Sequence, residues 1–221
     1  MNGYYLEKLS AQRLEKCYSI ALPRVQRYFT KELEHVINQI APHHRVLDLG
    51  CGYGRTLAAL GDNGAVVIGI DNSYSSLTLA RNKVPGCRVA TMNALHLGFA
   101  DNSFDIVCCI QNGISAFHVD QKGLLEEAVR VTKPNGIALF ATYSDKFWQH
   151  RLHWFKMQAD EGLLGELDME KTGRGTIICK DGFSARTITP SQFKELCCGL
   201  PAKIEIREVD ESSLFCQLTP Y

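Results

Sequence analysis

Short apolar runs alternate with helical stretches through the middle of the chain. The apolar runs cover residues 46–49, 66–70, 88–92, 104–110 and 137–143, and the helical stretches between them cover residues 56–60, 75–83 and 123–132. Several runs are apolar at almost every position, which is typical of strands buried on both faces of a parallel sheet. The pattern therefore predicts an α/β domain with a doubly wound, mostly parallel sheet covered by helices on both sides.

The first part of the chain has a different pattern. Residues 10–40 are predicted to be helical, with Ser10 as the N-cap and Pro23 dividing the stretch in two. After the proline, apolar residues recur at helical spacing and define one face: Val25, Phe29, Leu33, Val36, Ile37 and Ile40. We expect an N-terminal helical cap over residues 1–44, followed by the α/β domain over residues 45–221.

After Tyr143 the alternation of strands and helices lapses. Residues 145–172 include a helical stretch rich in aromatic and charged side chains, and Asp181-Gly182 then predicts the turn of a hairpin. The whole segment, residues 145–188, is an insertion after the fifth strand. It is either a surface excursion or a cover over the active site.

The end of the chain predicts one helix and two strands. Thr189 and Gln192 stand at the N-cap and N3 positions of a capping box, with a proline at N1. Two strand-like runs follow, over residues 204–209 and 213–218, and a polar turn separates them.

Composition narrows the class of protein. The 221 residues are 45% hydrophobic and 22% charged, which suits one domain with a sizeable core. Lys and Arg number 24, as do Asp and Glu, so the net charge is zero and a nucleic-acid partner is disfavoured. The start of the chain has no apolar core of a secretory signal, and no run of apolar residues is long enough to predict a membrane span.

Nine cysteines are many for this length, and they show no C-x-x-C spacing. Two pairs are adjacent in the sequence, and adjacent cysteines rarely bridge each other, so reduced thiols in a cytoplasmic protein are expected. His150 and His153 have a spacing that can bind a metal, but no third ligand accompanies them. No metal site is therefore predicted.

The most informative motif is the glycine-rich loop DLGCGYG at residues 48–54. A buried strand runs into this loop and then into a helix, so Gly50, Gly52 and Gly54 let the backbone pass close to a ligand beside free N–H groups. A dinucleotide fingerprint needs a small residue at position 55, which is Arg55, so a dehydrogenase is disfavoured.

Two aspartates accompany the loop. Asp48, inside the strand, needs a cationic or hydrogen-bond-donating partner if it is buried, and a ligand ammonium is one such partner. Asp71 ends the next apolar strand, where a carboxylate can accept hydrogen bonds from both hydroxyls of a ribose. Together with the glycine loop, the two carboxylates predict a nucleoside-containing ligand.

These motifs resemble those of the class I S-adenosylmethionine-dependent methyltransferases, particularly their UbiE-like, small-molecule branch, over residues 46–143. By this resemblance DLGCGYG is the glycine motif, Asp71 holds the ribose, and Asn135-Gly136 forms the turn before the fifth strand. The family has an acidic residue against the adenine amino group where this chain has Asn93. An asparagine departs from that pattern, although its amide oxygen can accept the same hydrogen bond.

The resemblance implies a Rossmann-like methyltransferase fold with seven strands, the last of them antiparallel. It also implies S-adenosyl-L-methionine as cofactor and S-adenosyl-L-homocysteine as product. The cofactor-binding residues that it implies are Asp48, Gly50, Gly52, Gly54, Asp71, Asn72, Asn93, Ala94 and Gln111.

The sequence constrains the methyl acceptor less. Methyl transfer from a sulfonium depends mainly on alignment and exclusion of water, and a base is needed only for some acceptors. His118, with Asp120 nearby, and Tyr143 are the candidate catalytic groups, and the alternative for His118 is an exposed residue near a helix start. The N-terminal tyrosines, Tyr4, Tyr5 and Tyr18, either pack against the sheet or form a lid over the cofactor.

A small, partly apolar acceptor is the expected substrate. Gln111-Asn112-Gly113 stands where nucleic-acid and glutamine N-methyltransferases have an N-P-P-Y-like element, which disfavours that chemistry. Methylation of a protein or RNA group is the second enzymatic interpretation. Cys17 and Cys179 leave a thiol or metalloid acceptor open, and a non-catalytic S-adenosylmethionine-binding module is the alternative from a different class.

Overall fold

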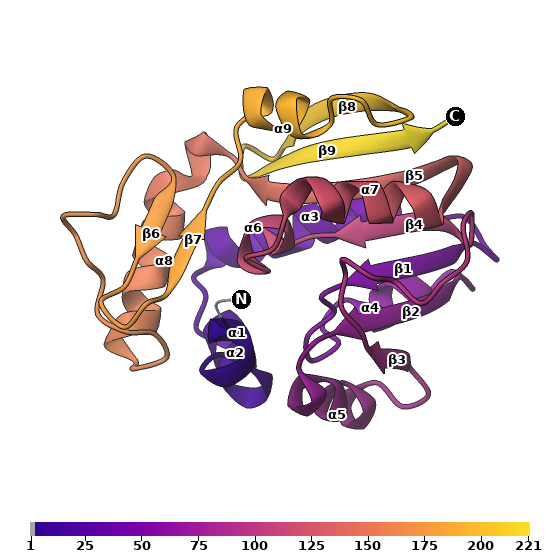
Figure 1. Ribbon diagram of the computed structural model, residues 1–221. Coiled ribbons are helices and arrows are strands. Elements are labelled where there is room, and N and C mark those ends of the chain that lie inside the picture. The colour runs from indigo at the N-terminus through magenta and orange to yellow at the C-terminus, as the bar shows by residue number, and fades with distance from the viewer. Residues whose placement is uncertain (1–2) are drawn as a thin grey trace.

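The computed structural model describes residues 3–221, and within them one sheet of seven strands forms the centre of the molecule (Figure 1). The strand order is β3-β2-β1-β4-β5-β9-β8. The strands are β1 (Arg45–Leu49), β2 (Val66–Asp71), β3 (Arg88–Thr91), β4 (Phe104–Cys109), β5 (Thr132–Tyr143), β8 (Ala202–Val209) and β9 (Ser213–Pro220). β1 to β5 pair in parallel, and β9 lies antiparallel between β5 and β8. The predicted doubly wound sheet with an antiparallel last strand is confirmed.

β1 is the strand from which the sheet extends in both directions. It pairs with β2 on one side and with β4 on the other, so the connections after β1 and β4 leave the sheet toward different faces. In open α/β sheets, ligands bind in the crevice that such a switch point creates outside the carboxyl ends of the strands. The order of the strands therefore fixes where a ligand site is expected.

Apolar clusters cover both faces of the sheet. On one face, α7 (Gln121–Val131) and α9 (Pro190–Leu196) pack over β4, β5 and β9. On the other face, α4 (Leu57–Gly61) and the second half of α3 (Pro23–Ile37) pack over the same sheet. Two further helices, α5 (Tyr74–Lys83) and α6 (Gly113–Ala116), follow β2 and β4. The helix α9 begins with the predicted capping box, in which the side chains of Thr189 and Gln192 each accept a hydrogen bond from the other residue's backbone N–H.

A second core lies beyond the carboxyl ends of the parallel strands. It joins α1 (Tyr4–Glu7), α2 (Ala11–Ser19) and the first half of α3 to the segment after β5. That segment contains η1 (Asp145–Phe147), α8 (Trp148–Asp160) and the small hairpin of β6 (Thr176–Ile178) and β7 (Ser184–Arg186). Figure 1 shows the two segments side by side at this end of the sheet. Residues far apart in sequence thus share one apolar core.

The strand β5 begins earlier than the pattern predicts. It starts at Thr132 rather than at residue 137, and its pairing with β4 is irregular between Phe104 and Ile106. Asn135 has a φ of +62°, a left-handed conformation that asparagine tolerates. A Cβ on Gly136 would lie 2.8 Å from the Asp105 carbonyl oxygen. The predicted turn at Asn135-Gly136 is therefore an irregularity inside the strand, and it does not separate the strand from the helix before it.

Candidate active site

A cavity of about 230 Å³ lies at the carboxyl edge of the sheet, between the strand ends, the N-terminal helices and α8. Most of the predicted cofactor-binding residues line it: Gly50, Gly52, Asp71, Asn72, Asn93, Ala94 and Gln111. They come from the ends of β1, β2, β3 and β4, which the sheet brings together although they are spread over some 60 residues of sequence. Asp48 and Gly54 do not line the cavity.

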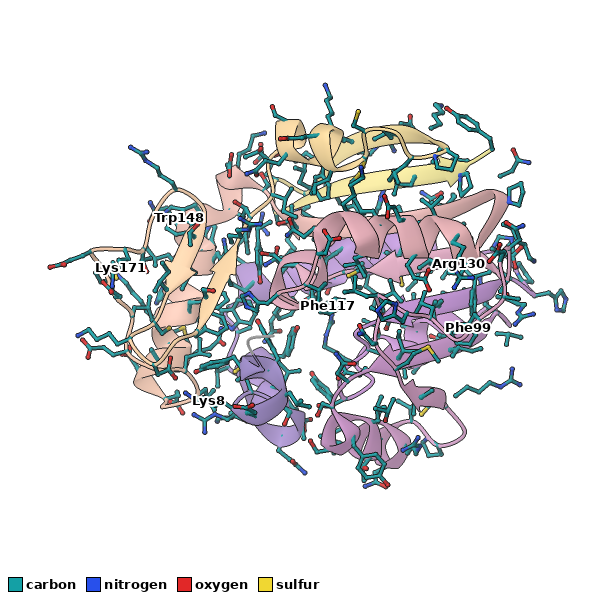
Figure 2. The ribbon with its side chains drawn as sticks, viewed as in Figure 1. Lys8, Phe99, Phe117, Arg130, Trp148 and Lys171 are labelled. Atoms are coloured by element: carbon teal, nitrogen blue, oxygen red, sulfur yellow. The ribbon has the colours of Figure 1, made fainter. Side chains whose placement is uncertain are left out.

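The glycine loop is held against the neighbouring strand. The backbone N–H groups of Gly50 and Cys51 both donate to the Ile70 carbonyl, over 2.8 and 2.9 Å. Gly50 has a φ of +78°, and a Cβ there would lie 2.5 Å from the ring of Phe117. Figure 2 shows Phe117 at this end of the sheet, with Phe99 and Arg130 at the other end. Only glycine fits the first position of the loop.

Asp71 presents a fixed carboxylate at the edge of the cavity. One carboxylate oxygen accepts a hydrogen bond from the Gly52 N–H at 2.9 Å, and the other accepts one from the Ser73 N–H at 2.7 Å. Burial raises the pKa of Asp71, and these backbone donors oppose the shift. Each carboxylate oxygen can accept a second hydrogen bond, so the group fits a ligand with two adjacent hydroxyls.

The side chain of Asn93 is partly committed within the protein. Its amide oxygen accepts a hydrogen bond from the Leu95 N–H at 3.0 Å. This oxygen is the atom expected from the sequence to bind the ligand, and it keeps one further lone pair for that purpose. The amide nitrogen of Asn93 faces no protein acceptor among residues 3–221.

Asp48 is buried behind the glycine loop and has partners inside the protein. The Thr56 hydroxyl donates to its carboxylate at 2.7 Å, and the Cys108 thiol lies 3.8 Å from the other oxygen. Burial raises the pKa of Asp48 to about 6, while the Thr56 hydrogen bond and the charge of Arg55 oppose the shift. The donor that a buried Asp48 needs is therefore Thr56. No ligand ammonium is required.

Gly54 serves packing. A Cβ at this position would lie 3.0 Å from the Cβ of Ala80, on α5. Its φ of +83° also favours glycine. Gly54 thus lets α5 pack closely against the glycine loop, which the hydrogen bond between Thr56 and Asp48 also stabilises.

A buried carboxylate, Glu32, holds the loop that follows β4. The backbone N–H and the side-chain amide of Gln111 both donate to it, and the Tyr28 hydroxyl donates at 3.3 Å. Gln111 itself has a φ of +56°, so this contact fixes a strained backbone position. Burial raises the pKa of Glu32 to about 7, against the opposing charge of Arg55 and the hydrogen bonds from Gln111 and Tyr28.

Glu32 is not among the residues predicted from the sequence, although the sequence carries a signal for it. It stands seven residues after Val25 and four before Val36, on the apolar face of the helix. A charged residue on such a face is buried with its partners, and here the partner is the loop after β4. The apolar face predicted from the sequence includes position 32, but Glu32 was not recognised there as a buried acidic residue.

The two candidate catalytic residues lie apart. Tyr143 lines the cavity, and the guanidinium of Arg151 lies 4.3 Å from the centre of its ring. Burial raises the pKa of Tyr143 to about 12, and the charge of Arg151 opposes this. His118 does not line the cavity. It packs near Ser184 and Arg186 of the hairpin, where burial, together with the charge of Arg186, lowers its pKa.

The N-terminal tyrosines also separate. Tyr5 and Tyr18 line the cavity. Tyr4 instead donates its hydroxyl to the Asp181 carboxylate at 2.6 Å and packs edge-on against Phe183 of the hairpin. One tyrosine therefore fastens the N-terminus to the insertion, and the other two contribute to the wall of the cavity.

Three residues of α8 complete the wall: Trp154, Phe155 and Gln158. The Trp154 indole N–H donates to the Cys17 carbonyl at 2.9 Å, which ties α8 to α2. None of the three was predicted as a site residue. The aromatic and charged character of residues 145–172 was the available signal, but periodicity alone does not show which side of that helix meets the cavity.

Metal-ligating side chains do not gather anywhere in residues 3–221, where no three of His, Cys, Asp or Glu could hold one ion together. His150 and His153 both lie on the exposed side of α8. All nine cysteines are free, and of the two with candidate roles Cys17 lines the cavity whereas Cys179 is buried in the hairpin away from it.

Comparison with known proteins finds a family match for the central part of the chain. Residues 47–140, from β1 to the middle of β5, match the methyltransferase domain family. Over this segment, which is less than half of the chain, the sequence is similar to that of methyltransferases. The matched residues contain the glycine loop, Asp71, Asn93 and Gln111, which are the residues on which the resemblance was based.

Two curated relatives and one solved structure illustrate the match. A demethylmenaquinone methyltransferase of Beutenbergia cavernae is 36% identical over 107 residues, which is 48% of this chain and 44% of the relative. An uncharacterized methyltransferase of Synechocystis sp. is 29% identical over 167 residues, covering 72% of this chain and 74% of the relative. A protein of Pyrococcus horikoshii has the same fold, with a TM-score of 0.72 at 20% identity over the full length of both chains.

The chain spans less than half the length of the first curated relatives it matches. The shared part is the half that forms β1 to β5 and the cofactor end of the cavity, whereas the insertion and α8 lie outside it. Within the described residues 3–221, no helix combines the length and apolarity needed to cross a membrane.

Proposed function

We propose that this protein transfers a methyl group from S-adenosyl-L-methionine to a small-molecule acceptor and releases S-adenosyl-L-homocysteine. The observation that carries the proposal is one cavity with two different ends. The glycine loop and Asp71 line it at the ends of β1 and β2, and Tyr143 and Trp154 line it at the end of β5, three strands from β2, and on α8. A methyltransferase needs both, a site for its cofactor and a space beside it for the acceptor.

The residues at the first end fit the cofactor. The Asp71 carboxylate suits the ribose hydroxyls, Gly50 and Gly52 allow close approach of the backbone, and Asn93 and Ala94 stand where the adenine is expected. When bound, the cofactor supplies an electrophilic methyl group on a sulfonium. The chain's own residues orient the reactants and exclude water, because the cavity lies beneath the N-terminal helices and α8.

Three further residues support the cofactor site indirectly: Asp48, Gly54 and Glu32. Asp48 and Gly54 stabilise the loop from behind, and Glu32 fixes Gln111 at the edge of the cavity. They act through the residues that meet the cofactor. His118 has no contact with the cavity, so Tyr143 is the better of the two candidate catalytic groups.

The N-terminal cap, residues 1–44, and the insertion, residues 145–188, would together cover the active site. Their shared apolar core supports this division from the α/β domain. An enclosed site of this kind favours a small acceptor over a protein or RNA group, and the demethylmenaquinone methyltransferase among the relatives is named for a small acceptor. The nine free cysteines favour a reducing, cytoplasmic location.

Isothermal titration of the purified protein with S-adenosylmethionine and S-adenosylhomocysteine tests the proposal. We expect micromolar binding of both and no binding of NADH, which serves as the control. Screening small phenols, amines and thiols for methylation then follows. Binding of NADH alone, or of none of the three, would contradict the proposed function.

A further inference from the structure

The side-chain amide nitrogen of Gln158 is buried at the wall of the cavity without a hydrogen-bond partner among the described residues. Gln158 lies on α8 and is 2% exposed, and its enclosed amide nitrogen donates to no protein oxygen within residues 3–221. Its backbone carbonyl accepts hydrogen bonds from the N–H groups of Leu163 and Leu164, which hold this end of the helix in place. Burying an unpaired amide costs free energy, so a fixed amide at a cavity wall indicates a polar group from outside the chain.

The side chains around this end of the cavity are aromatic. Tyr5, Tyr143, Trp154 and Phe155 line it together with Gln158. The Trp154 indole N–H already donates to the Cys17 carbonyl, so the tryptophan offers its ring and no free donor. Flat apolar walls of this kind suit a flat ring, which packs against aromatic faces.

No formal charge faces this end. Asp71, at the cofactor end, is the one charged side chain among the described residues that line the cavity. Arg151 stacks on the Tyr143 ring, is fully buried and donates to the carbonyls of Gly175 and Ala185 at 2.7 and 2.8 Å, while its Nε has no hydrogen-bond partner in the described part of the chain. It does not line the cavity, so a charged acceptor would lose its hydration without a direct ion pair at this end.

Arg55 and Glu32 lie behind the cavity wall, and one guanidinium nitrogen of Arg55 is buried without a hydrogen-bond partner in residues 3–221. The Arg55 guanidinium lies 4.9 Å from the centre of the Tyr18 ring and 5.3 Å from that of Phe29. Glu32 accepts its hydrogen bonds from Gln111 and Tyr28. Neither residue lines the cavity, so neither alters its uncharged character at the Gln158 end.

We propose that Gln158 determines specificity by binding an uncharged aromatic acceptor through a hydroxyl or carbonyl oxygen. An amide both donates and accepts hydrogen bonds and carries no charge, which matches such a group. The ring of the acceptor packs among Tyr5, Tyr143 and Trp154. This inference rests on the proposed function, because the cofactor would occupy the other end of the same cavity.

Three phenols with the same ring test the charge preference: p-cresol is neutral, tyramine is cationic and 4-hydroxyphenylacetate is anionic. Their affinities are measured by ligand-observed NMR with the protein saturated by S-adenosylhomocysteine. We expect p-cresol to bind at least 10-fold more tightly than either charged phenol. Equal affinity for the three, or no binding of p-cresol, would overturn the inference.

Variants of Gln158 test the residue itself. Gln158→Leu should weaken p-cresol binding at least 5-fold, and Gln158→Glu should shift the preference toward tyramine, a change that a merely structural role would not produce. Gln149→Leu changes an exposed glutamine of the same helix and should leave all three affinities as they are. Unchanged p-cresol affinity in Gln158→Leu would overturn the assignment.

The affinity for S-adenosylhomocysteine separates this inference from the proposed function. It should be the same in wild type and both Gln158 variants, because Gln158 lies on α8 and is not one of the strand-end residues that fit the cofactor. If S-adenosylhomocysteine binding were unchanged but the three phenols bound with equal affinity, the inference alone would be rejected. Loss of that binding in the wild type would reject the proposed function and the inference with it.

Discussion

Two carboxylates of the active site differ in what they contact, and this difference decides what each can do. Asp48 sits in β1, is 2% exposed and has Thr56 and Cys108 as partners. Asp71 ends β2 at the cavity, where only backbone N–H groups hold it. The first stabilises the glycine loop, whereas the second is free to accept further hydrogen bonds from a ligand.

Replacing Asp71 by asparagine should weaken the binding of S-adenosylmethionine by about 10- to 100-fold. An amide keeps the size of the side chain but accepts fewer hydrogen bonds and carries no charge, and hydrogen bonds to charged groups contribute about 1.5–3 kcal/mol. Calorimetric titration measures the effect. Asp62→Asn, at an exposed position, is the matched control. Equal affinities of the two variants would argue against Asp71 as the ribose-binding residue.

Glu32 should make the stability of the protein depend on pH. Its pKa in the folded state, about 7, lies above its ordinary value of 4.5, so between these values the folded protein holds a proton that the unfolded chain has released. The stability that protonated Glu32 contributes is complete below pH 4.5 and is lost as the pH rises through 7. Glu32→Gln should remove this loss, which amounts to about 2 kcal/mol between pH 5 and pH 8.

Urea unfolding at several pH values measures the Glu32 effect as the difference between wild type and variant. The raised pKa of Asp48 also makes the protein less stable as the pH rises. Because wild type and variant share this contribution, it cancels in the difference between their free energies of unfolding. Glu34→Gln, on the same helix but paired with Lys31 at the surface, should leave the slope as in the wild type. A parallel pH dependence in Glu32→Gln and wild type would show that Glu32 is ionised throughout.

At the scale of elements, local sequence determines much of the fold. The strands of the sheet, the hairpin turn and the capping box of α9 follow from patterns within about ten residues, and the structure has them where they were predicted. The start of β5 was not predicted correctly, because Asn135 adopts a left-handed conformation and the strand continues where a turn was expected. The sequence marks Asn135-Gly136 as a turn, and the strand pairs with β4 on both sides of it, at Thr132 and from Ile137 onward.

The site was predictable to the extent that it depends on strand ends. Gly50, Gly52, Asp71 and Gln111 meet because parallel strands end at one edge of the sheet. The position of Gln158 and of His118 relative to the cavity could not be predicted from strand ends. Whether a residue on an inserted helix faces the cavity depends on how that helix docks, and that is fixed by contacts with the N-terminus.

The capping box of α9 offers a test at this scale. Thr189→Ala removes the hydroxyl that accepts the Gln192 N–H and should cost about 1 kcal/mol of stability. Urea unfolding of Ser191→Ala, an exposed position one residue before Gln192, provides the control and should show less than half of that change. A Thr189→Ala variant as stable as the wild type would mean that packing of Phe193 alone holds the helix.

At the scale of the whole molecule, contacts between distant segments join the N-terminal helices to the insertion beside the cavity. The Arg13 side chain donates to the carbonyls of Gly162 and Leu163, about 150 positions later in the chain, and Tyr4 reaches Asp181. The helix α3 joins the two cores, since its first half packs with the insertion and its second half with the sheet. Separation of α1 and α2 from α8 would open this side of the cavity, and α2 is also held to α5 by the Glu15–Lys83 ion pair.

Arg13→Ala should make this opening easier. The arginine is partly exposed, and its two hydrogen bonds join the end of α8 to α2 over the cavity, so losing about 1 kcal/mol should raise the population of open molecules about 5-fold. Hydrogen exchange of α2 and dissociation of S-adenosylhomocysteine should then both be faster by a similar factor, since a bound ligand leaves only when the site opens. Arg27→Ala removes an exposed arginine that binds Asp210 on the far side of α3, and it should change neither rate. If Arg13→Ala exchanged α2 faster but released the ligand at the wild-type rate, the ligand would leave by a route that does not pass beneath α2.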